Sequence, residues 1–388
     1  MNVINGRIVI ALGALFFIST SWLYSASPAV FNSPDEAANF AVIEHFTRSE
    51  GLWLPAVAAD TQETRNLVHP RSMQVVGDRL VPAGFLGLPV IYGVIAYVTH
   101  PIVLAILSPL VALAGIAALY FLVLKMWVPD GPSERRPRDD RRVAMWSAFL
   151  LMAHPAFWYY TARGLFHNVL FVSLLLAGFC SVAYRRVILG IIFIFLALLT
   201  RPSEIWWVAI LAILVFMWYR DTVSSRQIVG WVAIAGLLVL ATVGLYSYVY
   251  GGVSLSAIAA QYGGGTEGVV SGAWWRWILP FGFHPRVMMF STARWYGLLV
   301  LPFTLLTLGG LALTIRAQSQ NIRRWAWMFL GVTAWLIAVY GSWLIFDNPS
   351  RDVTIGGAYL RYWLPSFVLG APLGAYVIVW CMEKISNK

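Results

Sequence analysis

The chain has 388 residues, of which 60% are hydrophobic and only 11% are charged, and its formal net charge is +10. Long apolar stretches recur up to the C-terminus, so the composition excludes an ordinary soluble domain and indicates a polytopic membrane protein. Cytoplasmic loops that face anionic lipids account for the positive charge. We therefore expect membrane lipids, and no nucleic acid, among its partners.

The first apolar segment is long enough to cross a bilayer, because residues 8–31 carry no charge and a crossing takes about 20 residues. Arg7 in front of it and the small residues after it also fit a cleaved signal peptide. The many later apolar stretches favour a retained first helix.

Further apolar stretches predict membrane-spanning helices, since only helices fit these lengths. They cover residues 101–128, 143–161, 165–184, 187–199, 202–219, 227–250, 293–315, 325–346 and 359–382. Residues 84–100 contain Pro89 and precede Pro101, which favours an interfacial or re-entrant helix. The predicted fold is an all-α polytopic membrane protein with about 10–11 transmembrane helices.

Basic residues predict the orientation, because cytoplasmic loops hold an excess of them. They gather in residues 129–142, at Arg185 and Arg186, and near Lys384. This places both termini on the cytoplasmic side of the cytoplasmic (plasma) membrane and residues 28–83, 251–292 and 347–358 outside.

Residues 1–388 therefore read as a single transmembrane domain with two notable outer segments. Residues 28–100 form a large first outer loop with juxtamembrane helices, and residues 35–50 can form an amphipathic helix along the membrane surface. Residues 251–292 form an outer loop expected near the site. Its glycine run, 263–265, predicts a flexible loop that covers substrate rather than a nucleotide-binding loop.

An acidic pair, Asp35 and Glu36, opens the first outer loop just past the first helix. Carboxylates there lie at a membrane surface, where chemistry on a lipid-borne substrate needs them. The competing interpretation is helix capping, because Ser33 or Asp35 precedes an apolar-periodic stretch with Pro34 near its first turn. Capping and catalysis are compatible.

Several cations map to the outer ends of helices, where the charge rule disfavours them. They are Arg163, Arg201, Arg276, Arg286, Arg294, Arg351, Arg361, His69, His167 and His284. A cluster of arginines suits a phosphate or pyrophosphate group. Each arginine alone can instead snorkel to lipid head groups, and Glu204 beside Arg201 can simply form an ion pair that closes a hairpin.

Disulfide formation and metal binding have little support in the sequence. Cys180 and Cys381 lie far apart and do not predict a disulfide, and no zinc-type Cys/His spacing occurs in the sequence. A mixed Asp/Glu site can hold a divalent cation, but one adjacent pair favours no metal. We expect no cofactor.

Three short motifs add a resemblance to a known family. They are His69-Pro70-Arg71, the aromatic stretch Tyr159 to Arg163, and Arg361-Tyr362-Trp363-Leu364-Pro365. Together with the Asp-Glu loop after the first helix, they resemble the GT-C superfamily of polyprenyl-phosphate-dependent glycosyltransferases. Within it the chain looks most like the protein O-mannosyltransferase group, although Arg71 stands where such enzymes often have a second proline.

The resemblance implies an inverting transfer of sugar from a polyprenyl-phosphate donor to an acceptor hydroxyl on a protein, glycan or lipid. Asp35 would be the general base, and Glu36 would orient it, bind sugar or do neither. The residues expected to bind donor phosphate are Arg361, Arg201, Arg163, His69 and Arg71. Further substrate contacts are expected from Glu204, Tyr362, His167, Tyr262 and His284.

Other classes of protein stay open from the sequence: a transporter or flippase, a noncatalytic scaffold, or another lipid-phosphate enzyme such as a membrane ligase. A transporter usually shows an inverted repeat and charges near the membrane midplane. Here no clear repeat is visible and the charges gather at one face. This favours the glycosyltransferase.

Overall fold

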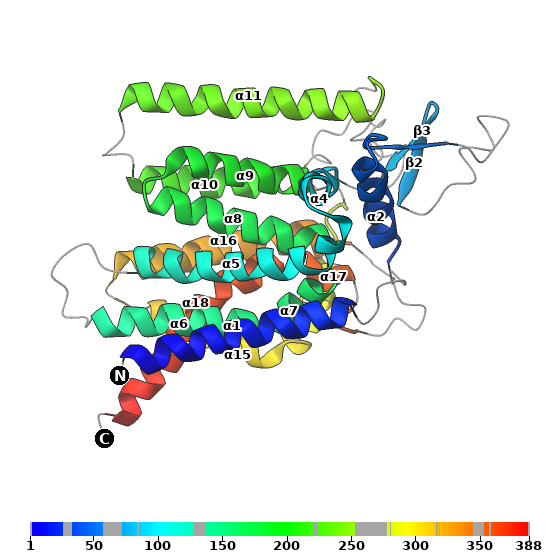
Figure 1. Cartoon of the computed structure of the whole chain (residues 1–388). Coiled ribbons are helices and arrows are strands. Elements are labelled where there is room, and N and C mark those ends of the chain that lie inside the picture. The colour runs from blue at the N-terminus through cyan, green and yellow to red at the C-terminus, as the bar shows by residue number, and fades with distance from the viewer. Residues whose placement is uncertain are drawn as a thin grey trace.

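The computed structural model describes residues 2–25, 33–56, 72–83, 85–127, 137–219, 224–252, 278–279, 281–315, 317, 319–343, 353–356 and 358–386. Over these residues the chain is predominantly helical and contains one small antiparallel sheet. Figure 1 shows the helices gathered into a bundle, with α2 and the strands at one end of it.

The helices have the following bounds in chain order. They are α1 (Asn2–Ser25), α2 (Pro34–Thr47), α4 (Gly87–Val98), α5 (Leu104–Met126), α6 (Pro137–Ala153), α7 (Pro155–Ala162), α8 (His167–Ala183), α9 (Val187–Thr200), α10 (Ile205–Tyr219), α11 (Ser225–Val249), α14 (Pro285–Ser291), α15 (Leu301–Ile315), α16 (Gln320–Tyr340), α17 (Ala358–Arg361) and α18 (Leu364–Ser386). Short 3-10 turns, η1 (Pro101–Val103) and η2 (Pro202–Glu204), precede α5 and α10, and a π-helical segment, η5 (Thr292–Leu298), follows α14.

The described helices confirm a multi-pass membrane protein. Four are long and apolar enough to cross a bilayer alone: Pro101–Met126, Arg226–Val249, Gln320–Tyr340 and Leu364–Ser386. The number rises to seven if each of three sharply bent helix pairs makes one span. The count of about 10–11 spans stays a prediction.

The two ends of the chain lie on the same side of the bundle. Figure 1 shows the start of α1 and the end of α18 together, opposite the end that carries α2 and the strands. That both termini share one side of the membrane, and which side this is, stay predictions.

Helix α4 lies across the end of the bundle instead of running along it. The proline-containing stretch 84–100 had led us to expect a helix that does not cross the membrane. Its 12 residues are seen nearly end-on in Figure 1, beside α2. Gly87 in its first turn approaches the end of α9 so closely that a Cβ there would lie 2.3 Å from the backbone nitrogen of Thr200. Contact with α2 and α9 therefore fixes α4 at the end of the bundle.

The segment between α1 and α4 contains three short strands that the sequence analysis did not predict. Strands β1 (Leu54–Pro55), β2 (Met73–Val76) and β3 (Arg79–Pro82) form an antiparallel sheet in the order β1-β3-β2. Gly77 has a φ of 63° in the two-residue turn between Val76 and Arg79, which suits a tight hairpin. The strands are too short for a clear alternating pattern, so the sequence did not reveal them.

Helix α11 lies at the edge of the bundle (Figure 1). None of its most apolar window is buried, but its C-terminal end is attached to the sheet. The Tyr250 hydroxyl donates to the Pro82 carbonyl at 2.9 Å, and Arg79 Nη1 donates to the Tyr248 carbonyl at 2.5 Å. Through these bonds α11 is coupled to β3.

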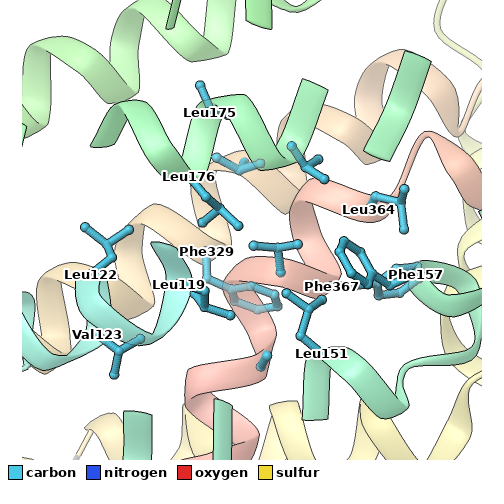
Figure 2. Close-up of a cluster of buried hydrophobic side chains, with 14 of the residues drawn as sticks. Leu119, Leu122, Val123, Leu151, Phe157, Leu175, Leu176, Phe329, Leu364 and Phe367 are labelled. Carbon is cyan, nitrogen blue, oxygen red and sulfur yellow. The ribbon is translucent and has the colours of Figure 1, made fainter. Parts of the chain in front are cut away.

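The core of the bundle is built from apolar side chains on helices distant in the sequence. Figure 2 shows Leu119, Leu122, Val123, Leu151, Phe157, Leu175, Leu176, Phe329, Leu364 and Phe367 in one cluster. In lipid, close packing rather than water exclusion holds helices together, so small residues matter at contacts. A Cβ at Gly310 of α15 would lie 2.1 Å from the Leu373 carbonyl oxygen of α18.

Gly310→Ala should therefore destabilise the protein, whereas Gly331→Ala should not. The added methyl at Gly310 must push α15 away from α18, and overpacking of this kind costs about 1–3 kcal/mol. A Cβ at Gly331 of α16 meets no atom within 4 Å, and alanine favours a helix over glycine. Thermal unfolding in detergent measures both. Equal melting temperatures for the two variants would contradict the close contact between α15 and α18.

Candidate functional site

The N-terminus of α2 carries the acidic pair, and its first turn is capped by Ser33. The Ser33 hydroxyl accepts a hydrogen bond from the Asp35 backbone N–H at 3.3 Å, with Pro34 in the first turn. Such a cap satisfies one of the free N–H groups at the helix start. Since Ser33 performs the capping, the carboxylate of Asp35 is left to contact other parts of the chain.

Asp35 contacts two segments that are remote from it in sequence. Its Oδ1 accepts a hydrogen bond from the Ser72 hydroxyl at 2.5 Å, and its Oδ2 accepts one from Arg361 Nη2 at 3.1 Å. Ser72 directly precedes β2, and Arg361 ends α17. Asp35 therefore joins the start of β2 to α17, the short helix in front of α18.

Glu36 anchors α2 to the bend between α7 and α8. Its carboxylate accepts two hydrogen bonds from Arg163, one from Nε to Oε1 at 3.3 Å and one from Nη2 to Oε2. One turn later, Asn39 Nδ2 donates to the Leu165 carbonyl at 2.9 Å. Because the Glu36 side chain is only 3% exposed, this pairing fixes where α2 lies.

A third pair, Arg201 and Glu204, closes the bend between α9 and α10. Arg201 donates from Nε and Nη2 to Glu204 Oε1 at 3.1 and 2.6 Å. Tyr340 donates to the same oxygen at 2.5 Å, and Trp207 Nε1 donates to Oε2 at 2.6 Å. The hairpin ion pair that the sequence offered as an alternative is thus the observed geometry.

Aromatic rings join the pair of Arg201 and Glu204 to the pair of Asp35 and Arg361. The ring of Tyr362 stacks on Tyr340 with centroids 4.7 Å apart. The guanidinium of Arg201 lies 4.8 Å from the Tyr362 centroid, and that of Arg361 lies 5.2 Å from it and 4.7 Å from Phe166. Cation–π contacts of this kind hold an arginine in an apolar setting without neutralising it.

Helix α8 contributes two further contacts at the same end of the bundle. Asn168 Nδ2 donates to the Arg361 carbonyl at 3.1 Å, which fixes α17. The His167 ring Nε2 lies 2.8 Å from the Phe85 carbonyl oxygen. The start of α8 therefore holds α17 and the backbone at Phe85.

The three ion pairs differ in how far their charged groups remain available to bind a ligand. The side chains of Glu36 and Glu204 are each 3% exposed, whereas that of Asp35 is 38% exposed. Arg361 Nε is buried and has no hydrogen-bond partner among the described residues. Of the pairs described, Asp35 and Arg361 therefore combine an accessible carboxylate with an unused N–H donor.

The surroundings of Asp35 favour its ionised form. Burial alone would raise the pKa of Asp35, but the positive charge of Arg361 and the hydrogen bond from Ser72 outweigh it, so the pKa lies below its ordinary value. The carboxylate is consequently ionised at neutral pH and is a hydrogen-bond acceptor only.

The structure brings together most of the residues that the sequence singled out. Asp35, Glu36, Arg163, His167, Arg201, Glu204, Arg361 and Tyr362 lie in this cluster. His284 is exposed and its backbone N–H donates to the Ser342 hydroxyl at 3.1 Å, so the contacts seen for it do not join it to the pairs. His69, Arg71, Tyr262, Arg276 and Arg351 lie outside the described residues.

Sequence reasoning missed Ser72, Asn39, Asn168 and Tyr340. Asn39 is three residues after Glu36, so both lie on one face of α2, and that spacing was a readable signal. Nothing in the sequence pointed to Ser72.

In the part of the chain that the structure describes, no group of three or more His, Cys, Asp or Glu side chains is placed to hold a metal ion. Asp35, Glu36 and Glu204 each have an arginine as a partner. The absence of a cofactor stays a prediction.

Comparison of the chain with protein-family models, with curated proteins and with solved structures gives no match.

Glu36→Gln should destabilise the protein strongly, because it leaves the guanidinium of Arg163 in a largely buried position without its counter-charge. Breaking a buried pair on one side costs about 3 kcal/mol or more. Glu44→Gln is a matched control on the same helix, since its pair with Arg48 is 44% and 63% exposed and such pairs contribute roughly 0.3–0.5 kcal/mol. Unfolding in a detergent titration measures both. Similar losses for the two variants would contradict the anchoring role of Glu36.

Proposed function

We propose that this protein is a membrane glycosyltransferase that moves a sugar from a polyprenyl-phosphate donor to an acceptor hydroxyl, with inversion of configuration. The observation that carries the proposal is the state of the Asp35 and Arg361 pair. Its carboxylate is 38% exposed and its guanidinium retains a buried Nε–H without a partner in the described residues. A base and an anion-binding group thus lie side by side, as the resemblance to the GT-C superfamily implies.

Asp35 is the general base in this proposal. An ionised carboxylate within hydrogen-bond reach of a hydroxyl can take its proton as the new bond to the anomeric carbon forms. The Ser72 hydroxyl, 2.5 Å from Oδ1, is evidence that a hydroxyl fits there. The anchoring of α2 through Glu36 and Arg163 keeps the base in place, which geometry-sensitive catalysis requires.

Arg361 stabilises the departing lipid phosphate. Its guanidinium lies between the rings of Phe166 and Tyr362, where low polarity strengthens its attraction for an anion. The free Nε–H offers a hydrogen bond to a phosphate oxygen. Negative charge beside Arg361 also weakens its hold on Asp35, so donor binding raises the pKa of Asp35 and makes it a better base.

Arg163 and Arg201 have a different role from the one the sequence suggested. Each is already neutralised by its own carboxylate, Glu36 or Glu204, so we assign them to shaping the site. His69 and Arg71 remain proposed donor contacts, and Tyr262 a proposed contact from the outer loop. The acceptor is a protein, glycan or lipid hydroxyl.

The proposal also includes the cellular setting. The protein lies in the cytoplasmic membrane with both termini inside and the cluster around Asp35 at the outer surface. The positive loops on the side of the termini support this orientation, as does the position of α2 at the opposite end of the bundle (Figure 1).

Asp35→Asn should keep the fold and reduce sugar transfer about 10²- to 10⁴-fold, the usual contribution of a general base. The assay follows radiolabelled sugar from a panel of polyprenyl-phosphate donors, with the protein in nanodiscs. Glu44→Gln, an exposed change on the same helix, should transfer like wild type. Wild-type rates from Asp35→Asn would remove Asp35 from the base role, and no donor binding by wild type would favour a transporter.

The pH dependence should differ between kcat/KM and kcat. Since the pKa of Asp35 is depressed in the free protein, its ionised form persists to a lower pH than that of an ordinary aspartate. The acid limb of kcat/KM, which reports the free enzyme, should therefore lie below the range in which an ordinary aspartate titrates. Bound phosphate should move the acid limb of kcat to higher pH. Coincident limbs would show that donor binding does not act on Asp35.

A further inference from the structure

Ser72 has an unusual backbone conformation and a direct contact with the proposed base. Its φ is 67°, in the left-handed region that residues with a side chain rarely adopt. Its carbonyl accepts a hydrogen bond from the Ala83 N–H at 2.9 Å, and the next residue, Met73, pairs with Pro82 in the sheet. The sheet therefore holds the backbone of Ser72 where its hydroxyl reaches Asp35.

We propose that the Ser72 hydroxyl occupies the acceptor position on Asp35 until an acceptor hydroxyl displaces it. Ser72 is in this sense a positioning residue that acts through Asp35. The inference rests on the proposed function, because it assigns the acceptor site of that same reaction to one carboxylate oxygen.

The two oxygens of Asp35 have different partners, and this identifies the acceptor side. Oδ2 faces Arg361, which the proposed reaction assigns to the phosphate, and Oδ1 faces Ser72. A hydroxyl is the group that an ionised carboxylate must bind before it removes a proton. Ser72 presents that same group to Oδ1 at 2.5 Å.

Displacement of Ser72 needs only a change of its side chain. The hydrogen bond to Ala83 holds the backbone, whereas the side chain is half-buried, and rotation about its χ1 angle carries the hydroxyl away from Asp35. An acceptor that brings its own hydroxyl can replace this bond, so the exchange conserves hydrogen bonds.

The arrangement has a chemical purpose in a transferase. A base open to solvent would activate water, and the donor would be hydrolysed instead of transferred. While Ser72 covers Oδ1, a single water molecule must compete with a tethered hydroxyl. Ser72 therefore suppresses hydrolysis of the donor while no acceptor is bound, and an acceptor held by further contacts displaces it.

The chain offers a matched control for the test. Ser49, at the end of α2, has a φ of 65° and is exposed. Glycine at either position relieves the left-handed backbone, but only Ser72→Gly removes the donor to Asp35. Comparison of Ser72→Gly with Ser49→Gly therefore separates backbone relief from loss of the hydroxyl. Ser72→Ala, which keeps a side-chain carbon, is a second variant.

The measurement follows free sugar released from one radiolabelled polyprenyl-phosphate sugar without acceptor, and product formed when acceptor is added. Ser72→Gly and Ser72→Ala should raise donor hydrolysis without acceptor roughly tenfold, the effect of one hydrogen bond to a charged group. They should also lower the KM for acceptor and leave the KM for donor unchanged. Ser49→Gly should match wild type in all three quantities.

Two results would overturn the inference. One is an unchanged rate of hydrolysis without acceptor and an unchanged acceptor KM in both Ser72 variants when their melting temperatures match wild type. The other is a sugar adduct on Ser72 in wild type, found by mass spectrometry, because Ser72 would then be an acceptor itself: its oxygen bonds to the anomeric carbon, its proton goes to Asp35 and the lipid phosphate leaves. If Asp35→Asn abolishes transfer in the same assay, either result rejects the role of Ser72 and leaves the glycosyltransferase intact.

Discussion

The buried ion pair between Glu36 and Arg163 determines the arrangement at the end of the bundle. Two charges taken out of water are tolerated only when each satisfies the other, and here two hydrogen bonds join them. This requirement fixes α2 against the bend between α7 and α8. Asp35 precedes Glu36 by one residue, so its place opposite Arg361 follows from the anchor.

Charge balance explains why this end of an apolar bundle is stable. Asp35, Glu36 and Glu204 are matched one to one with Arg361, Arg163 and Arg201, so the paired groups carry no excess charge. An anionic head group that enters such a cluster must replace a carboxylate as the partner of one arginine. Arg361 is the arginine best placed for this exchange, because its partner carboxylate is the most exposed of the three.

Local sequence signals predicted the positions of the helices better than they predicted which side chains pair with one another. Apolar lengths and the proline at position 89 predicted the multi-pass helices and the crosswise α4, and the position of Glu204 beside Arg201 predicted the closed hairpin there as one alternative. The pairing of Glu36 with Arg163 joins residues 127 positions apart in the sequence. A periodic pattern within one helix gives no information about a contact at that separation. The hairpin of β2 and β3 was missed because four-residue strands carry almost no pattern. The pair of Arg201 and Glu204, three residues apart, was readable as one alternative.

Helix α11 links the lipid around the protein to the sheet that carries Ser72. It lies at the edge of the bundle and is bonded to β3 through Tyr250 and Arg79. A long apolar helix tilts when the hydrocarbon layer thins and straightens when it thickens. A tilt of α11 in a bilayer would act on β3, and β3 is paired with β2 directly after Ser72. The thickness of the bilayer would then bear on the contact between Ser72 and Asp35.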